Sequence, residues 1–172
     1  MITIITGSRG VGKTTYLLKL IEELNNKGKP SSGIITPAIY NKTGTKVGFF
    51  ALNVATGEKW DLGRSDRNLD GPSYGPYSFS EKGFLKANKI LMQGLTKGRK
   101  DLFLDEIGPL ELEKGYGFLP VLSSVSSFSS NLNLYLIIRP SLIAEFLDRF
   151  LKGKEYRVVE ITARNRNQIL KQ

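Results

Sequence analysis

Apolar residues follow two different spacings along the chain. Short runs rich in apolar residues, which are typical of buried strands, occupy residues 2–6, 33–40, 101–105, 133–138 and 157–161. Between these runs, apolar residues recur every three or four positions over residues 14–25, 80–95, 118–125 and 142–150, as on one face of a helix. Residues 162–171 are expected to form a short last helix. This alternation predicts an α/β fold with a mainly parallel sheet, helices on both faces, and ligands at the carboxyl ends of the strands.

The middle of the chain departs from this alternation. Residues 46–54 and 58–62 are typical of an antiparallel hairpin that turns at residues 55–57. Residues 63–76, rich in Ser, Gly, Pro, Asp and Arg, are long for a connection in a compact domain, and we interpret them as a candidate lid. The serine-rich residues 123–130 are interpreted as a solvated connection. Ser78 or Ser80 is expected to cap the helix that follows it, and Ser141 the helix over residues 142–150.

Length and composition limit the possible chemistry. A chain of 172 residues has the size of one ordinary domain, so we expect a single domain over residues 1–172. The chain has no cysteine and no histidine, which excludes disulfides, thiol nucleophiles, Ser-His-Asp triads and the common zinc sites. Catalysis must therefore depend on carboxylates, Lys, Arg, hydroxyl groups and a hard metal ion. No apolar run is long enough to span a bilayer, and we expect a cytoplasmic monomer without membrane contact.

The net charge is +9, which favours polyanions such as nucleotides, RNA or DNA as partners. The densest basic stretch, residues 97–100, follows a predicted helix. We interpret it as the positively charged C-terminal end of that helix rather than as a nucleic-acid patch, because no aromatic RNA-binding motif accompanies it. A nucleic-acid partner is therefore possible but not favoured.

The strongest motif follows the first apolar run. Gly7, Ser8, Arg9, Gly10, Val11, Gly12, Lys13 and Thr14 match the pattern G-x-x-x-x-G-K-[ST] at every fixed position, and Thr15 follows them. Glycine allows the backbone to turn its N–H groups toward phosphate oxygens, and the next helix adds the positive end of its dipole. Lys13 is expected to contact the β and γ phosphates, and Thr14 to bind Mg²⁺ through its hydroxyl group. The motif predicts a nucleotide-binding site.

A second motif ends the apolar run at residues 101–105, where Asp105 and Glu106 stand side by side. Acids at the carboxyl end of a strand lie where the ligand of such a sheet must be. We expect Asp105 to hold the Mg²⁺ and Glu106 to orient and deprotonate the attacking water.

Negative charge that develops on the γ phosphate requires a cation besides Lys13 and the metal. Arg139, which ends the strand at residues 133–138, is the favoured catalytic arginine, and Arg9 and Arg166 are the other candidates. The aromatic residues Trp60, Tyr74 and Tyr77 are suited either to stacking on a base or to packing the hairpin, and packing is favoured.

The chain resembles a known family at several of these places. The segment from Gly7 to Thr15, together with Asp105-Glu106-Ile107-Gly108 and Leu110-Glu111-Leu112, is similar to the small nucleoside-triphosphatase family described from thermophiles, which includes the cancer-related nucleoside triphosphatase. Further similar segments are residues 33–36, residues 44–49 and Asn165-Arg166. The resemblance implies a P-loop NTPase fold with an additional strand between the phosphate-loop strand and the acidic strand. It also implies slow Mg²⁺-dependent hydrolysis of several NTPs.

We therefore expect an enzyme that hydrolyses ATP, GTP and other NTPs to the diphosphate and phosphate. A nucleoside or nucleotide kinase has the same loop and fold, but an arginine-bearing lid is missing because residues 63–76 contain only Arg64 and Arg67. A nucleotide-gated RNA- or DNA-binding module is the other alternative, and the positive charge supports it.

Overall fold

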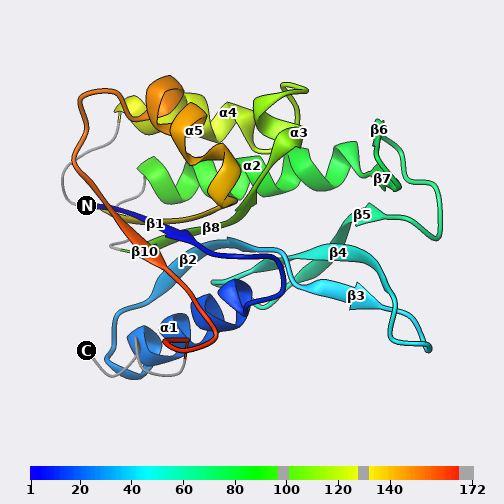
Figure 1. The fold of residues 1–172 in the computed structure, drawn as a ribbon, viewed down its shortest axis with the longest axis horizontal. Coiled ribbons are helices and arrows are strands. Elements are labelled where there is room, and N and C mark those ends of the chain that lie inside the picture. The colour runs from blue at the N-terminus through cyan, green and yellow to red at the C-terminus, as the bar shows by residue number, and fades with distance from the viewer. Residues whose placement is uncertain (97–100, 128–131, 167–172) are drawn as a thin grey trace.

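The computed structural model describes residues 1–96, 101–127 and 132–166 of the chain (Figure 1). Within these residues the strands are β1 (Ile2–Thr6), β2 (Ser31–Ile35), β3 (Ala38–Tyr40), β4 (Lys46–Asn53), β5 (Lys59–Arg64), β6 (Ser73–Tyr74), β7 (Tyr77–Phe79), β8 (Asp101–Ile107), β9 (Asn133–Ile138) and β10 (Tyr156–Glu160). The helices are α1 (Lys13–Asn26), α2 (Glu81–Thr96), α3 (Pro109–Leu112), α4 (Leu119–Ser124) and α5 (Ile143–Phe150), with 3₁₀ helices at Val125–Ser127 and Pro140–Leu142. None of these helices is long and apolar enough to cross a membrane.

The strands form one sheet in the order β10-β1-β9-β8-β2-β4-β5-β7-β6, and β3 pairs with β4. From β10 to β2 in this order, adjacent strands are parallel, and β2 pairs antiparallel with β4. β9 lies between β1 and β8, which confirms the additional strand beside the phosphate-loop strand. Because β1, β9 and β8 run in the same direction, the phosphate loop after β1, Arg139 after β9 and the two acids near the end of β8 all lie at the carboxyl ends of the strands.

Helices cover both faces of the sheet, as the α/β prediction requires. In Figure 1, α1 lies on one face, and α2, α4 and α5 lie on the other. Alternate residues of the central strands divide between the two faces, as the strand period of two dictates. In β8, Leu102 and Leu104 join the core under α2, α4 and α5, whereas Phe103 joins the core under α1. Each central strand is thus buried on both faces. Packing on both faces fixes the backbone of the strand and hence the residues at its carboxyl end.

The antiparallel part is larger than the predicted hairpin. β4 and β5 pair antiparallel as predicted, and β7 and β6 then continue the sheet beyond β5. The sequence pattern predicted one strand over residues 33–40, but the structure has β2 and β3, separated by Thr36 and Pro37. Proline has no backbone N–H for the ladder, so the strand ends there and β3 pairs with β4 instead of extending β2.

Several predicted helix boundaries need correction. Ser80 caps α2, since its Oγ accepts a hydrogen bond from Gly83 N at 3.0 Å, whereas the prediction that Ser141 caps the next helix is wrong. Pro140 begins a 3₁₀ turn that already contains Ser141, and α5 begins after Leu142. The serine-rich residues 123–127, predicted as a connection, are helical. Residues 162–166 form a turn, and the remainder of the last predicted helix lies outside the described residues, as do residues 97–100 and 128–130.

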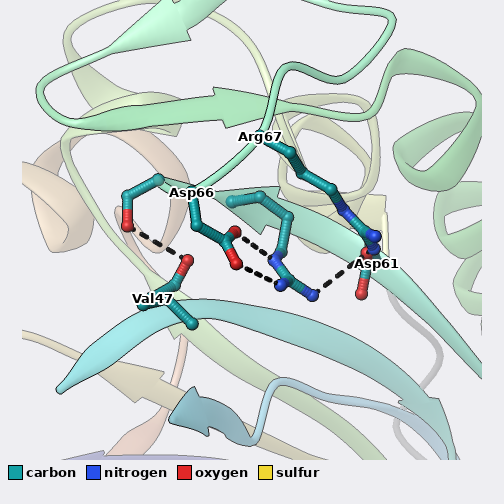
Figure 2. A network of polar contacts seen from close by, with 6 residues as sticks. Val47, Asp61, Asp66 and Arg67 are labelled. Carbon is teal, nitrogen blue, oxygen red and sulfur yellow. Dashed lines mark hydrogen bonds and ion pairs between the residues drawn. The ribbon is translucent and has the colours of Figure 1, made fainter. Parts of the chain in front are cut away.

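Ion pairs fix the start of the candidate lid (Figure 2). Arg64 donates to both carboxylate oxygens of Asp66, at 2.8 and 2.7 Å, and to Asp61 at 3.4 Å. Arg67 pairs with the same Asp61 carboxylate. Both arginines of the segment are therefore occupied by acids of their own strand and loop.

The rest of this segment is also joined to the sheet. Ser65 Oγ donates to the carbonyl oxygen of Val47 in β4 at 3.1 Å (Figure 2). Farther along, Ser73 and Tyr74 form β6, a hairpin partner of β7 that the sequence pattern did not predict. Opening this segment as a lid would therefore require breaking strand pairs, and its lid role stays a prediction.

Candidate functional site

A cavity of about 830 Å³ opens where the parallel strands end. Its volume is in the range of small-molecule sites. Most of the predicted site residues line it, namely Gly7, Arg9, Gly10, Gly12, Lys13, Thr14, Thr15, Asp105, Glu106 and Arg139. Ser8 and Val11 do not: Ser8 is exposed and contributes its carbonyl group to a lysine contact, and Val11 packs against the core under α1. The structure therefore brings together the two sequence motifs, although Thr14 and Asp105 are 91 residues apart in the chain.

Glycine is required in the phosphate loop between β1 and α1. Gly7, Gly10 and Gly12 have φ angles of 144°, 76° and 106°, which side chains strongly disfavour. A Cβ atom at Gly7 would also lie 2.3 Å from the carbonyl oxygen of Ile161, so the loop packs closely against the end of β10. The loop leads directly into the N-terminus of α1, where free backbone N–H groups favour an anion.

Lys13 folds back over this loop. Its Nζ donates to the carbonyl oxygens of Gly7 at 2.8 Å and Ser8 at 2.9 Å. Burial lowers the pKa of Lys13 from its usual value, and the nearby Asp105 and Glu106 carboxylates act in the opposite direction. The ammonium group is thus held by two carbonyl groups at the place where the loop is expected to bind phosphate oxygens.

Thr14 and Asp105 connect the two motifs. Thr14 Oγ1 donates to Asp105 Oδ2 at 2.9 Å, and the backbone N–H of Thr36 donates to the same oxygen at 3.2 Å. The Asp105 side chain is almost completely buried, and burial raises its pKa to about 6, with a further contribution from the Glu106 charge. A buried carboxylate is costly to ionise, so a divalent cation beside Asp105 would compensate its charge.

The donor set at this place fits Mg²⁺. A threonine hydroxyl and a carboxylate are hard oxygen ligands, and Mg²⁺ is usually held by one or two carboxylates together with phosphate and water oxygens. Among the described residues no cluster of three potential acidic, histidine or cysteine ligands exists. The site therefore fits a metal that arrives with a phosphate ligand better than a metal held by the protein alone.

Glu106 differs from its neighbour in both backbone and surroundings. Its φ is 67°, and the pairing of β8 with β9 shifts register between Leu104 and Ile107. Such an irregularity changes the direction of a side chain next to a site. The Glu106 side chain is 33% exposed, and its Oε1 lies 3.3 Å from Nη2 of Arg139. Asp105 therefore points into the protein toward Thr14, while Glu106 remains in contact with the solvent in the cavity.

The structure separates the three candidate arginines. Arg139 lines the cavity and pairs with Glu106, and Arg9 also lines the cavity. Arg166 instead lines a smaller cavity of about 180 Å³, which lies between the start of α1 and the turn after β10. Arg139 is thus the candidate whose guanidinium group already contacts an acidic residue of the site.

The aromatic candidates divide as well. Tyr74 and Tyr77 line the cavity, whereas Trp60 does not. Trp60 Nε1 donates to the carbonyl oxygen of Gly83 at 3.0 Å, and the Lys86 ammonium group lies 4.5 Å from its ring centroid. Trp60 therefore packs the antiparallel strands against α2, as the favoured interpretation predicted.

Sequence reasoning assigned no role to Glu111, which shapes the wall of the cavity. Its buried carboxylate accepts hydrogen bonds from the backbone N–H groups of Gly108 at 2.9 Å and Phe118 at 3.2 Å. Gly117 has a φ of 69°, and a Cβ atom there would lie 2.2 Å from Glu111 Oε1. Glu111 thus joins the two ends of the segment from Gly108 to Phe118. The signal in the sequence was an acid flanked by two leucines at a buried helical position.

Glu111 should make the stability of the protein depend on pH. Burial raises its pKa from 4.5 to about 7, so the folded chain binds more protons than the unfolded chain between these values. The free energy of unfolding is therefore expected to be higher at pH 5 and to fall as the pH rises to about 7, with a contribution of about 2 kcal/mol from Glu111 over this range. Asp105 acts in the same direction. Urea unfolding of wild type and Glu111→Gln at several pH values measures this contribution.

Glu111→Gln should flatten this pH dependence and leave the share that comes from Asp105. The exposed neighbour Glu113, changed to Gln, is the matched control and should keep the wild-type slope. The same slope in wild type and Glu111→Gln would contradict the assignment.

Comparisons with known proteins agree with this geometry. A family model described as NTPase matches residues 2–172. The nucleoside-triphosphatase THEP1 of Hyperthermus butylicus is 34% identical over 111 residues, which cover 63% of this chain and 57% of that relative, so the match spans little more than half of the relative's length. The crystal structure of THEP1 from Aquifex aeolicus has a TM-score of 0.79 and 26% identity, and the match covers 99% of this chain and 95% of that chain.

The solution structure of a human cancer-related nucleoside triphosphatase is also similar, with a TM-score of 0.73, 25% identity, and coverage of 98% of this chain and 93% of that chain. The family model, the thermophile relative and the two structures together confirm the resemblance seen in the sequence motifs. The chain therefore belongs to the NTPase family, whose model matches it from residue 2 to residue 172.

Proposed function

We propose that the protein hydrolyses nucleoside 5′-triphosphates to the diphosphate and phosphate in a Mg²⁺-dependent reaction. The observation that carries the proposal is the 2.9 Å hydrogen bond between Thr14 Oγ1 and Asp105 Oδ2, beside Glu106. This contact joins a phosphate-binding loop to a buried carboxylate, which is the arrangement that a triphosphate with its metal requires. The names of the relatives, nucleoside-triphosphatase, support the same reaction.

The phosphate loop and Lys13 would bind the triphosphate. Backbone N–H groups from Gly7 to Thr15 and the N-terminus of α1 supply donors, and the Lys13 ammonium group supplies a full charge. To contact phosphate oxygens, Lys13 would exchange its two carbonyl partners for them. Thr14 and Asp105 would hold Mg²⁺, which neutralises charge on the phosphates when it is bound.

Glu106 would orient the attacking water and take its proton. Its side chain reaches the cavity, while the neighbouring Asp105 is turned toward Thr14, so the two acids have separate roles. Arg139 would stabilise the charge on the γ phosphate, because its guanidinium group lies 3.3 Å from Glu106 and lines the same cavity. A phosphate next to Arg139 would weaken its pairing with Glu106 and leave that carboxylate available to water.

Breadth of substrate and a monomeric state are parts of the same proposal. The binding groups named above contact phosphates and metal, which are common to ATP, GTP and the other NTPs, so base identity should have a small effect on binding. All of these groups come from a single chain. One copy of the protein should therefore be sufficient for activity.

Phosphate release from ATP, GTP, CTP, UTP and their deoxy forms, measured with and without Mg²⁺, tests the proposal. The expected result is release from each triphosphate, and loss of release when EDTA removes the metal. Binding of NTP·Mg²⁺ without phosphate release would reject hydrolysis, and release that is independent of divalent metal would reject the metal site. Wild type with Mg²⁺ and no nucleotide is the background control.

A further inference from the structure

A buried threonine hydroxyl group, that of Thr36, follows β2 at its carboxyl end. Thr36 is only 4% exposed, yet its Oγ1 has no hydrogen-bond partner among the described residues. Burying a hydroxyl group without a partner costs free energy, so folded proteins have few such groups and each one requires an explanation. Asn88 Oδ1 and Tyr116 Oη also lack a partner in the described part of the chain, but of these three residues only Thr36 lines the large cavity.

Close packing of β2 against β8 places Thr36 beside the two acids. The strands are parallel, with Ile34 opposite Leu104 in the register. Gly33 makes this close approach possible, because a Cβ atom there would lie 2.1 Å from the carbonyl oxygen of Phe103, and its φ of 129° disfavours a side chain. Thr36 follows Ile34 by two residues, and the two acids come directly after Leu104. Thr36 and the acids therefore lie at the same end of neighbouring strands.

Thr36 contacts Asp105 through its backbone. Its N–H donates to Asp105 Oδ2 at 3.2 Å, and this oxygen is also the acceptor for Thr14 Oγ1. Burial raises the pKa of Asp105, and the backbone N–H and hydroxyl group of Thr36 act in the opposite direction. The hydroxyl group is thus close to the carboxylate, although outside hydrogen-bonding geometry. It therefore lies near the place where Thr14 and Asp105 would hold Mg²⁺, with its own hydrogen-bonding capacity unused.

A metal site of the proposed kind needs hydrogen-bond acceptors beyond the metal ligands themselves. Mg²⁺ is octahedral and usually keeps several water molecules, because it loses its hydration shell reluctantly. These waters are strong donors, and the groups that accept from them orient the ligands and adjust metal affinity. A threonine hydroxyl group accepts through two lone pairs. Thr14 and Asp105 already supply the protein ligands, so the unpaired hydroxyl group of Thr36 is suited to a water of the metal shell.

We propose that Thr36 is a positioning residue for the metal, whose hydroxyl group accepts a hydrogen bond from a water molecule in the Mg²⁺ shell. The inference rests on the proposed NTP·Mg²⁺ site and adds a contact from the end of β2 to those of Thr14 and Asp105. Thr36 acts through this water and orients the metal relative to the phosphate loop. The buried hydroxyl group gains its partner when nucleotide and metal bind.

Calorimetry with a non-hydrolysable ATP analogue, in Mg²⁺ and in EDTA, tests the inference on the full chain. The ratio of the two affinities measures how much the metal contributes to binding. Thr36→Val exchanges the hydroxyl group for a methyl group of similar size. Its affinity in EDTA should equal that of wild type, whereas its affinity in Mg²⁺ should be about tenfold lower, as expected for the loss of one hydrogen bond. Thr36→Ser keeps a hydroxyl group and should restore the wild-type ratio.

Mn²⁺ provides a second measurement that does not depend on turnover, because it prefers the same octahedral oxygen ligands as Mg²⁺. In the complex of protein, analogue and Mn²⁺, water labelled with a magnetic oxygen isotope broadens the EPR lines and so counts the water ligands. Wild type and Thr36→Val should have the same number, because Thr36 contacts a water and not the metal. One additional water ligand in Thr36→Val would show that the hydroxyl group binds the metal directly, and would overturn the inference.

Thr3→Val is the matched control, because Thr3 is a buried threonine of β1 that does not line the cavity. Its hydroxyl group accepts a hydrogen bond from Arg157 Nε at 2.8 Å, so Thr3→Val should lower the stability of the fold and keep the wild-type affinity ratio. Thr36→Val, measured by urea unfolding without nucleotide or metal, should be no less stable than wild type. A clear loss of stability would show that the hydroxyl group is already bonded, and would remove the basis of the inference.

The remaining outcomes separate this inference from the proposed function. Equal affinity ratios in wild type and Thr36→Val would overturn the inference. A parallel loss of affinity in Mg²⁺ and in EDTA would do the same, since it would assign Thr36 to the shape of the site, and so would a failure of Thr36→Ser to restore the ratio. The proposed function fails in a different way, because wild type would then bind the analogue equally well with and without Mg²⁺, or would not bind it.

Discussion

Replacing Glu106 with glutamine is expected to reduce NTP hydrolysis by about 10²–10⁴-fold, the usual contribution of a general base, with little change in NTP affinity. The amide is nearly the same size as the carboxylate but does not take a proton from water. Binding should persist because the phosphate loop, Lys13 and the Thr14–Asp105 pair are unchanged. Phosphate release at saturating NTP·Mg²⁺ gives the turnover number, and calorimetry with a non-hydrolysable analogue gives the affinity.

Glu145→Gln is the matched control for this experiment, because Glu145 is an exposed acid in the first turn of α5 and does not line the cavity. It should hydrolyse NTP at the wild-type rate. If Glu106→Gln does so as well, Glu106 is not the base. A large loss of affinity in Glu106→Gln would instead assign it to substrate binding.

Removing the ammonium group of Lys13 should weaken binding and turnover together. Lys13→Ala would remove the cation that we propose contacts the phosphates, and removal of one such electrostatic contact typically reduces turnover by about 10²–10³-fold. The carbonyl groups of Gly7 and Ser8 also lose their donor, so the loop should become less ordered in the absence of nucleotide. The same phosphate-release and calorimetric measurements report both effects.

Lys29→Ala controls for the loss of one positive charge, since Lys29 is exposed in the connection after α1. It should leave binding and turnover unchanged. Normal affinity in Lys13→Ala would show that the backbone of the loop binds the triphosphate without this side chain, and would limit Lys13 to the chemical step.

The features predicted best from sequence have local causes. The phosphate loop was predictable because its glycines and Lys13 occur at a fixed spacing in one short segment, between a strand and a helix. The parallel order of the strands followed from the alternation of strand and helix patterns. The position of β9 between β1 and β8 came from the family resemblance, and the structure confirms it.

The features that escaped prediction depend on partners distant in the sequence. β6 has only two residues, and its pairing with β7 is visible only once β7 is placed beside β5. The role of Glu111 depends on the backbone N–H of Phe118, which a helical pattern does not show. The separation of Asp105 from Glu106 depends on the register shift between β8 and β9, whereas the sequence shows only two adjacent acids.

The positive φ angle of Glu106 has a consequence for the evolution of this chain. A residue with a side chain in such a conformation costs about 1–3 kcal/mol, a cost that glycine would avoid. Selection for thermal resistance alone would therefore replace this glutamate, and its proposed role as the base would retain it. At position 106 thermal stability favours glycine and the proposed activity favours glutamate. A relative that has lost the activity could therefore have glycine at this position.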